Sequence, residues 1–324
     1  MNARRPCFLL AALWLAAGCR PEAEPGLGPA AAPADPAPVA AVRTEGSVTT
    51  DDGERLHYTT VGEGPQTVVI PVGVYLETAL APLAEGRRLV FYDPRCRGRS
   101  GCADPARASL DRSIADLEQL RAGLGIERMA LVGWSGLGME TVAYALRHPE
   151  RVTRIVQVAP IPPAKALFDA GGGGREEADP EAVAEVERRI EAGEGDPQEL
   201  CRQYNALTLP ASFADPANVA RVPDVCGFAN EQPANLWAYF DALLPSFGDY
   251  DLRDEIGNLG IPRLVVHGRE DGMPLAGAEA WAAAGDARLI VLSPAGHFPF
   301  LERPDEFFPA VDRFLDGGWP EGAE

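Results

Sequence analysis

The stretch LVGWSGLG, residues 131–138, decides how this chain folds. The apolar run that leads into it, 129–132, predicts a buried strand, and the glycines on either side of Ser135 predict a sharp turn. A helical pattern follows and ends at His148-Pro149. A serine at the apex of a strand–turn–helix unit presents its hydroxyl beside the N–H groups of the helix start. The stretch therefore predicts a nucleophile at Ser135, and an ordinary serine cap of the helix is the alternative.

Strand and helix patterns alternate on both sides of this stretch. Upstream, the sequence predicts strands at 47–50 and 55–60 around the turn Asp51-Asp52-Gly53, strands at 66–70 and 89–92, and a helix at 113–124. Downstream, it predicts strands at 152–158, 263–267 and 288–292 and helices at 275–284 and 305–315. Strands that alternate with helices indicate the α/β class, with a mostly parallel, doubly wound sheet covered by helices on both faces.

The alternation stops at Ala159-Pro160-Ile161-Pro162-Pro163 and resumes only near residue 255. The intervening sequence predicts a loop at the glycine run 171–174 and helices at 180–191 and 235–244. We therefore expect a helical insertion over 161–255 that divides one α/β core into the segments 43–160 and 256–324.

The first residues, 1–18, resemble a bacterial lipoprotein signal peptide. Arg4 and Arg5 precede an apolar run that is too short to span a bilayer, and this run ends Leu15-Ala16-Ala17-Gly18-Cys19. The resemblance implies cleavage before Cys19 and attachment of lipid to that cysteine. An ordinary secretory signal, cut near Ala17 or Gly18, is the alternative.

The residues that follow Cys19 predict a tether. The segment 19–42 is mostly Pro, Ala and Gly, so it buries little surface and behaves as an extended linker. We expect it to hold the folded part away from a membrane in which Cys19 is anchored. The lipoprotein resemblance implies an exported protein of the bacterial cell envelope, and Arg20 favours the outer membrane or periplasm over retention at the inner membrane.

The charge of the chain argues against two classes of partner. The 324 residues carry a formal net charge of −19, and loss of Arg4 and Arg5 with the leader takes it from −19 to −21. Such a chain does not bind nucleic acid or anionic lipid through its charge. Its apolar content of 46% supports a sizeable core in one large domain.

Four cysteines remain outside the leader and the lipidation site, and an even number in an exported protein is consistent with disulfides. Four cysteines allow three pairings, and proximity along the chain favours Cys96–Cys102 and Cys201–Cys226. None of them has the spacing or the neighbouring histidines of a zinc site, so no metal is expected.

Four segments of the core resemble the α/β-hydrolase superfamily, in the group that includes esterases, lactonases and proline-iminopeptidase-like enzymes. They read FYDPRCRGRS (91–100), VGWSGLGMETVAYALRHPERV (132–152), LVVHGREDGMP (264–274) and AGHFPFLERPDEFFPAVDRFL (295–315). They occur in the family's order and span the catalytic domain. The resemblance implies the family's sheet, and it makes the helical insertion the family's lid.

The resemblance also implies a catalytic triad. Ser135 matches the nucleophile, Asp271 follows a strand where the family has its acid, and His297 follows the last strand where the family has its base. An imidazole must take the serine proton, and a carboxylate must orient that imidazole. The alternatives are Asp249 and Asp251 for the acid and His57, His148 and His267 for the base.

The oxyanion hole is expected at the backbone N–H groups of Gly136 and Val74. Two positions nearby depart from the family pattern. Val72-Gly73 stands where the family has His-Gly, which alters the bracing of the loop but not its donors. Leu137 stands where the family prefers a small residue, so it must find space in a crowded turn. Asp93 is expected to shape the turn after its strand.

These residues predict a serine hydrolase that cleaves a small ester, lactone or amide through an acyl-enzyme, with no metal and no organic cofactor. One alternative is an aminopeptidase similar to proline iminopeptidase, in which Glu231 binds the substrate amine; Glu231 otherwise caps the next helix. The lid aromatics Trp237, Tyr239 and Phe240 either line an acyl pocket or pack the lid onto the core. The other alternative is a non-catalytic surface lipoprotein that keeps the fold.

Overall fold

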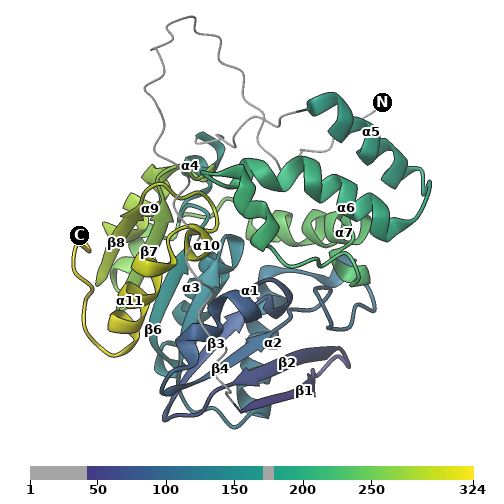
Figure 1. Ribbon diagram of the computed structural model, residues 1–324. Helices are drawn as coiled ribbons and strands as arrows, with labels where there is room; N and C mark the ends of the chain where they lie inside the picture. Colours follow the sequence, from purple (N-terminus) through teal and green to yellow (C-terminus); the bar gives the residue numbers. More distant parts are fainter. Residues whose placement is uncertain (1–41, 171–178) are drawn as a thin grey trace, which may run out of the picture.

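An eight-stranded sheet forms the centre of the computed structural model (Figure 1). Its strands are β1 (Arg43–Thr49), β2 (Arg55–Val61), β3 (Gln66–Pro71), β4 (Arg87–Tyr92), β5 (Met129–Trp134), β6 (Val152–Val158), β7 (Arg263–Gly268) and β8 (Ala287–Leu292). They lie in the order β1-β2-β4-β3-β5-β6-β7-β8. β2 is antiparallel to both of its neighbours, and all other neighbouring strands are parallel. This arrangement confirms the predicted α/β class.

The structure describes residues 42–170 and 179–324. The predicted signal peptide, the lipidation site Cys19, the tether up to residue 41 and the predicted glycine loop 171–174 lie outside these residues. Within the two described ranges, no helix is long and apolar enough to cross a membrane.

Helices cover both faces of the sheet. α1 (Gly73–Leu80), α10 (Pro299–Glu302) and α11 (Pro304–Leu315) pack on one face, and α2 (Leu110–Gly123), α3 (Gly136–Arg147) and α9 (Leu275–Ala282) pack on the other. Alternate residues of each strand supply the two cores: Val68 and Ile70 of β3 face the first core, and Val69 faces the second. Because successive side chains of a strand point to opposite faces, strands that are apolar throughout belong in the middle of this arrangement.

The predicted hairpin is formed by β1 and β2, and Gly53 in its turn has a φ of +87°, which favours glycine. Five helices are not predicted from the sequence pattern: α1, α6 (Pro197–Thr208) and the short helices α4 (Lys165–Ala170), α8 (Arg253–Gly257) and α10. α1 begins behind Val72, whose φ is 61°, and it has no side-chain cap. The usual signals of a helix start are therefore missing there.

Only helices occur among the described residues between β6 and β7, apart from one isolated bridge of Ala164 with Asp251. They are α4 (Lys165–Ala170), α5 (Pro180–Glu191), α6, α7 (Pro233–Leu243) and α8 (Arg253–Gly257), and short 3₁₀ turns lie between α6 and α7 and between α7 and α8. α5, α6 and α7 lie together at one end of the molecule (Figure 1). We refer to residues 161–255 as the lid.

Two disulfides form, and both are the pairs that proximity along the chain favours. Cys96–Cys102 closes the loop after β4, and Cys201–Cys226 ties α6 to the lid segment that precedes α7. One disulfide therefore braces the core and the other braces the lid.

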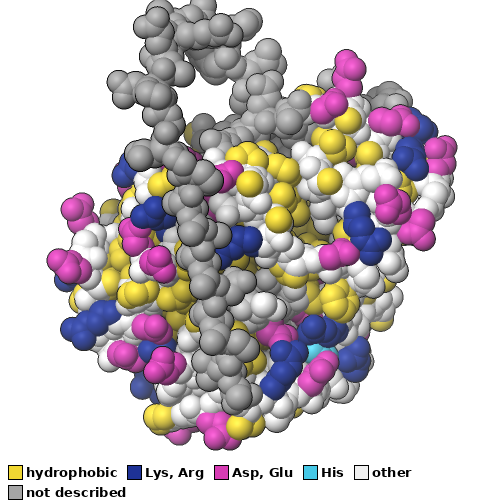
Figure 2. All heavy atoms as spheres, in the orientation of Figure 1, with side chains coloured by type: hydrophobic (Ala, Val, Ile, Leu, Met, Phe, Trp, Pro, Cys, Tyr) yellow, Lys and Arg dark blue, Asp and Glu magenta, His cyan; other side chains and the backbone are white. Residues whose placement is uncertain are grey.

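The surface carries both signs of charge close together. On the face shown in Figure 2, Lys and Arg side chains lie among Asp and Glu side chains. Ion pairs within helices, such as Arg112–Asp116 of α2 and Arg188–Glu185 of α5, follow the same pattern. On this face, the acidic side chains are therefore not gathered into one patch.

Candidate active site

Ser135 occupies the sharp turn between β5 and α3. Its backbone has a φ of 57° and a ψ of −130°, a combination that residues other than glycine rarely adopt. Its N–H donates to the carbonyl oxygen of Val158 at 2.9 Å, and its own carbonyl accepts from the N–H of Gly138 at 3.0 Å. Strain of this kind persists only where the surrounding structure enforces it, which is common at functional sites.

The glycines of the turn are required by close backbone contacts. A Cβ on Gly133 would lie 2.4 Å from the carbonyl oxygen of Leu137, and a Cβ on Gly138 would lie 2.9 Å from the Cβ of Pro160. Only glycine fits both positions without displacing the backbone. α3 can therefore start close to the end of β5, with Ser135 at the apex.

Asp271 and His297 form a pair. His297 Nδ1 lies 3.0 and 3.1 Å from the two carboxylate oxygens of Asp271. Asp271 follows β7 and His297 follows β8, and their side chains are 1% and 15% exposed. The N–H of Met273 donates to the carboxylate of Asp271 at 3.0 Å, which fixes its orientation. Because the carboxylate engages Nδ1, Nε2 is the ring nitrogen left to act on another group.

Trp134 joins this histidine to the serine turn. It directly precedes Ser135, and its indole N–H donates to the carbonyl oxygen of His297 at 2.8 Å. The centroids of the Trp134 and His297 rings are 5.1 Å apart. The indole therefore brings the histidine loop next to the end of β5. Its place beside the serine is the one sequence signal that could have suggested this role.

A single carboxylate holds the histidine loop to the lid. Glu302 accepts hydrogen bonds from three backbone N–H groups, those of Gly296, Asp215 and Ala214, at 2.6, 3.0 and 3.2 Å. The N–H of His297 itself donates to the carbonyl oxygen of Ser212 at 2.7 Å. The position of the imidazole therefore depends on lid residues 212–215 as well as on the core.

The prediction that Val74 is an oxyanion donor is wrong for this conformation, because its N–H is already bonded. It donates to the carboxylate of Asp93 at 3.0 Å, and Asp93 also accepts from the N–H of Arg99 at 2.9 Å. Asp93 is fully buried, and this burial raises its pKa. The other predicted donor, Gly136, is the first residue of α3, where N–H groups have no partner within the helix.

Leu137 and Val72, which depart from the family pattern, pack against each other. They form a buried cluster with Val74 and with Val225 of the lid. The bulky Leu137 thus finds its space against the lid, directly beside the serine turn. A cavity of about 410 Å³ and one of about 10 Å³ lie among the described residues, and neither is lined by Ser135, Asp271 or His297.

The prediction that Glu231 binds a substrate amine is also wrong, because its carboxylate is already paired. It accepts from Nε and Nη2 of Arg97, both at 3.0 Å, and from the N–H of Gly98 at 2.7 Å. Arg97 is 7% exposed and Glu231 is 2% exposed. Burial acts to lower the pKa of Arg97, but the adjacent carboxylate raises this pKa above its ordinary value. The pair fastens the lid to the loop after β4.

The lid aromatics pack against other side chains: Tyr239 is buried, and Trp237 and Phe240 are half-buried. Tyr239 is 1% exposed, and the guanidinium of Arg97 lies 5.6 Å from the ring centroids of both Tyr239 and Phe240. Trp237 packs edge-on against Tyr204, with centroids 5.7 Å apart. These contacts match the packing alternative, and none of them supports an acyl pocket lined by the three rings.

The alternative acids and bases lie in other surroundings. Asp249 is exposed, and Asp251 pairs with Arg253 at the surface. His57 contacts Glu45 at 2.6 Å, and His148 stacks on Tyr144. His267 lies nearest, with Nδ1 3.9 Å from Asp271, and burial lowers its pKa. Among the described residues, no group of three or more His, Cys, Asp or Glu side chains is placed to hold a metal ion.

A buried carboxyl that the sequence does not single out lies near the start of α3. Glu140 is 8% exposed, and burial raises its pKa to about 7. The side chain of Ser113 is its hydrogen-bonding neighbour. Together with Leu137 and Tyr144 it lines a cavity of about 10 Å³, roughly the space of one water molecule.

Comparisons with known proteins agree with this architecture. A family model for the alpha/beta hydrolase fold matches residues 71–304. The chain is 26% identical over 260 residues to a pimeloyl-[acyl-carrier protein] methyl ester esterase of Aeromonas hydrophila, covering 78% of this chain and 96% of that protein. It is 28% identical over 282 residues to the 2-hydroxy-6-oxononadienedioate/2-hydroxy-6-oxononatrienedioate hydrolase of Paraburkholderia xenovorans, covering 82% and 92%. A solved alpha/beta fold family hydrolase of Bacillus anthracis matches with a TM-score of 0.65 and 20% identity, over 86% of this chain and 99% of that one.

Proposed function

Since the chain belongs to the α/β-hydrolase fold family, we propose that it is a serine hydrolase that cleaves a small ester, lactone or amide. Ser135 attacks the carbonyl carbon while Nε2 of His297 takes the hydroxyl proton, and Asp271 orients and stabilises the charged imidazole. His297 then gives the proton to the leaving group as the acyl-enzyme forms. Water, deprotonated by the same nitrogen, releases the acid and restores the serine.

The observation that carries this proposal is the pairing of His297 with Asp271 beside the strained backbone of Ser135. The carboxylate engages Nδ1, which leaves Nε2 as the nitrogen that we propose takes the proton of Ser135. The contact of Trp134 with His297 supports the same arrangement, since residue 134 is the neighbour of the serine.

We assign the donors of the oxyanion hole to backbone N–H groups at the starts of two helices. The N–H of Gly136 belongs to the first turn of α3. Because Asp93 engages the N–H of Val74, we assign the second donor to Gly73, the first residue of α1. Removal of one such donor typically raises the barrier by roughly 3 kcal/mol.

A fluorophosphonate probe tests the role of the serine. We expect the probe to label the wild-type protein and the Ser47→Ala control, whose serine is exposed on β1. Ser135→Ala should abolish labelling and ester hydrolysis while the melting temperature stays near that of the wild type. Labelling that survives Ser135→Ala would remove the serine from its role, and a wild-type protein that never reacts would favour the non-catalytic alternative.

The relatives support an ester or related acyl substrate. One of them is a methyl ester esterase and the other a dienedioate hydrolase. Glu231 no longer supports the aminopeptidase alternative, because its carboxylate is bonded to Arg97. We therefore expect turnover of short aryl esters to exceed turnover of proline arylamides, and the reverse order in a paired assay would restore the aminopeptidase.

We further propose that the protein is an exported lipoprotein, anchored through Cys19 and held off the membrane by the tether 19–42. The two disulfides support export, because such bonds persist in oxidising compartments. Metabolic labelling with a radioactive fatty acid should mark the wild type and a Cys7→Ala control but not Cys19→Ala. Label retained by Cys19→Ala would contradict the anchor.

A further inference from the structure

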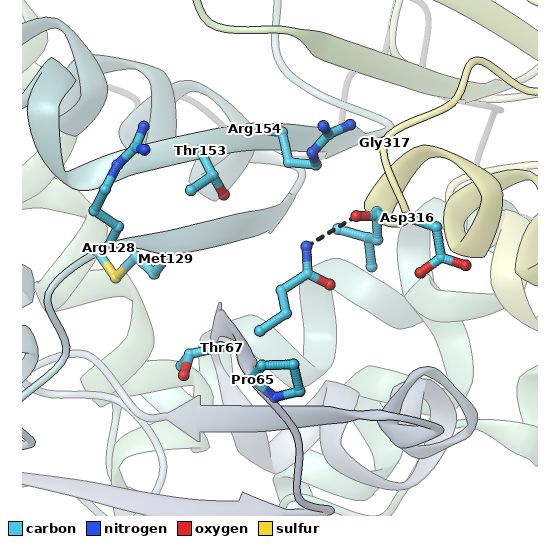
Figure 3. A pocket seen from close by; sticks show the side chains of 10 residues that line it. Pro65, Thr67, Arg128, Met129, Thr153, Arg154, Asp316 and Gly317 are labelled. Carbon is cyan, nitrogen blue, oxygen red and sulfur yellow. Dashed lines mark hydrogen bonds between the residues drawn. The ribbon is translucent and has the colours of Figure 1, made fainter.

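A cavity of about 410 Å³ lies at the ends of the strands that are opposite to Ser135 (Figure 3). It is formed by the first residues of β3 and β6, by the start of β5 and by the end of α11. Met129 lines the cavity and Ser135 follows the other end of β5, so the two positions are about 20 Å apart. The volume suits a small ligand, and the distance separates this cavity from the proposed catalytic chemistry.

Two arginines of the cavity have no acidic partner. Arg128 donates to the carbonyl oxygen of Val152 at 3.2 Å, and Arg154 donates to the carbonyl oxygen of Phe314 and lies 5.1 Å from the centre of its ring. Within residues 42–170 and 179–324, no carboxylate oxygen lies within 4 Å of either guanidinium. Burial lowers the pKa of Arg154 below its ordinary value, and the charges of Asp286 and Asp316, which act in the opposite direction, only partly offset this effect.

Thr153 lies between these arginines with a hydroxyl that has no partner. Met129 pairs with Val152 and Ala130 pairs with Arg154, so Thr153 is an extra residue on β6, a β-bulge. Its Oγ1 is buried and makes no hydrogen bond within the described structure. Figure 3 places its side chain between those of Arg128 and Arg154. A buried hydroxyl without a partner costs stability, so an acceptor that reached this hydroxyl would be stabilised.

One acidic residue, Asp316, lines the same cavity, but its carboxylate is already paired with an arginine. The carboxylate of Asp316 accepts from Arg87 at 2.6 Å. In Figure 3, Asp316 lies on the far side of the cavity from Arg128. The end of the cavity formed by Arg128, Thr153 and Arg154 therefore keeps an excess of positive charge.

We propose that this cavity binds a small oxyanion, the carboxylate or phosphate group of a small molecule, between Arg128, Thr153 and Arg154. Guanidinium groups and a hydroxyl are the donors that oxyanions prefer, and both arginines have N–H groups beyond the one used in the fold. In a chain with a net charge of −19, an anion is attracted only where positive charge is gathered locally. Binding there leaves the serine turn free.

Thermal unfolding of the full chain tests the proposal. The protein is titrated with sodium phosphate and with sodium succinate, each against sodium chloride of equal ionic strength. We expect at least one of the two to raise the melting temperature in a saturable way above the chloride baseline. Saturation with phosphate alone assigns a phosphorylated ligand, and saturation with succinate alone assigns a carboxylate. If neither exceeds chloride, the proposal is wrong.

Variants locate the effect. Thr153→Val and Arg128→Gln should each weaken the apparent affinity about tenfold. Thr153→Val should fold with unchanged or higher stability when no anion is present, because it removes an unbonded hydroxyl and keeps the shape. Arg288→Gln is the matched control, since Arg288 lies over Trp319 at 4.8 Å outside the cavity. If Arg288→Gln weakens binding as much as Arg128→Gln, the effect is general charge and the site is refuted.

Discussion

Asp271 is the residue on which the proposed chemistry depends most after the serine itself. Its side chain is 1% exposed and is bonded both to His297 and to the N–H of Met273. Asp271→Asn keeps an acceptor for Met273 but loses the charge that selects the tautomer of the imidazole. We expect kcat to fall by about 10⁴-fold with little change in melting temperature.

The control for this prediction is Asp251→Asn. Asp251 was the alternative acid, but its carboxylate pairs with Arg253 at the surface. Its loss should change kcat less than about twofold, since surface ion pairs contribute little. If Asp251→Asn were the damaging change and Asp271→Asn the mild one, the assignment of the acid would be reversed.

Glu140 makes the stability of the fold depend on pH. Its carboxyl titrates near 4.5 when free and near 7 in the folded protein, because burial penalises the charged form. As pH rises from 4.5 to 7, the unfolded chain loses this proton first. The contribution of Glu140 to folding is therefore complete below pH 4.5 and declines up to about pH 7, by about 3 kcal/mol.

Glu140→Gln isolates this effect. We expect its free energy of unfolding, relative to the wild type, to be about 3 kcal/mol higher at pH 8 than at pH 4, as measured by urea denaturation. The exposed Glu279→Gln on α9 serves as control and should show no such pH dependence. A difference between Glu140→Gln and wild type that is constant with pH would contradict the explanation.

At the scale of elements, the main junction is the contact of the lid segment 229–232 with the loop after β4. The buried side chains of Arg97 and Glu231 pair there, and Asn230 donates to the carbonyl oxygens of Gly98 and Ser100 at 3.2 and 2.8 Å. Cys96–Cys102 braces the loop, and Cys201–Cys226 braces the lid nearby. The junction is thus polar at its centre and covalently stiffened on both sides.

Loss of one partner of the buried pair should be costly. Glu231→Gln leaves a buried guanidinium without its counter-charge, and we expect a loss of about 3–5 kcal/mol in the free energy of unfolding. The double variant Arg97→Met/Glu231→Leu should recover much of it, because no charge is then left unpaired. Asp224→Asn, which breaks the exposed pair of Asp224 with Arg202, should cost less than about 1 kcal/mol. Equal losses for all three variants would contradict a special role for the junction.

The two disulfides should contribute unequally. Loop-closure entropy gives about 3.5 kcal/mol for Cys201–Cys226, whose cysteines are 25 residues apart, and about 2 kcal/mol for Cys96–Cys102, which are 6 apart. Replacement of each pair by serines, followed by denaturation, measures the two values. A larger loss for the shorter loop would show that the loop after β4 acts through the lid junction instead.

Much of the core could be predicted because its elements follow strict periods. β6 and α5 have the predicted limits, and β5 with α3 follows from the glycines around Ser135. α6 was not predicted, although Asp196 caps it. In the insertion, strands and helices do not alternate, so a polar helix is hard to distinguish from a loop. α1 carries no start signal that could have been recognised.

The site was predictable where it depends on chain order and not where it depends on partners. Asp271 and His297 each follow a core strand, so they meet at one edge of the sheet. The predictions for Val74 and Glu231 failed because each residue is bonded to a partner from another part of the chain, Asp93 and Arg97 respectively. Sequence shows which polar groups exist, but it does not show which of them already satisfy each other.

For the whole molecule, charge is the property that the solvent can change most easily. The net charge of −19 opposes compaction through self-repulsion. An increase of sodium chloride from 10 to 150 mM shortens the screening length from about 30 to about 8 Å. We therefore expect the melting temperature to rise over this interval and then level off. A fall over the same interval would mean that the ion pairs outweigh the repulsion.

The lid also limits access at this scale. The cluster of Val72, Val74, Leu137 and Val225 joins core and lid beside the serine. The cavities of about 410 and 10 Å³ in the described structure are not lined by Ser135, Asp271 or His297. We therefore expect residues near Val225 to move when substrate enters.

The three backbone hydrogen bonds of Glu302 have a consequence for the rate of the proposed reaction. The carboxylate that secures Gly296, next to the imidazole, also secures Ala214 and Asp215 of the lid. If the lid opens at residue 214, these hydrogen bonds break, and the loop that carries His297 is then held less firmly. Under the proposed mechanism, we therefore expect substrate entry and bond cleavage to occur in separate steps, so that a second nucleophile that enters while product leaves would find His297 displaced.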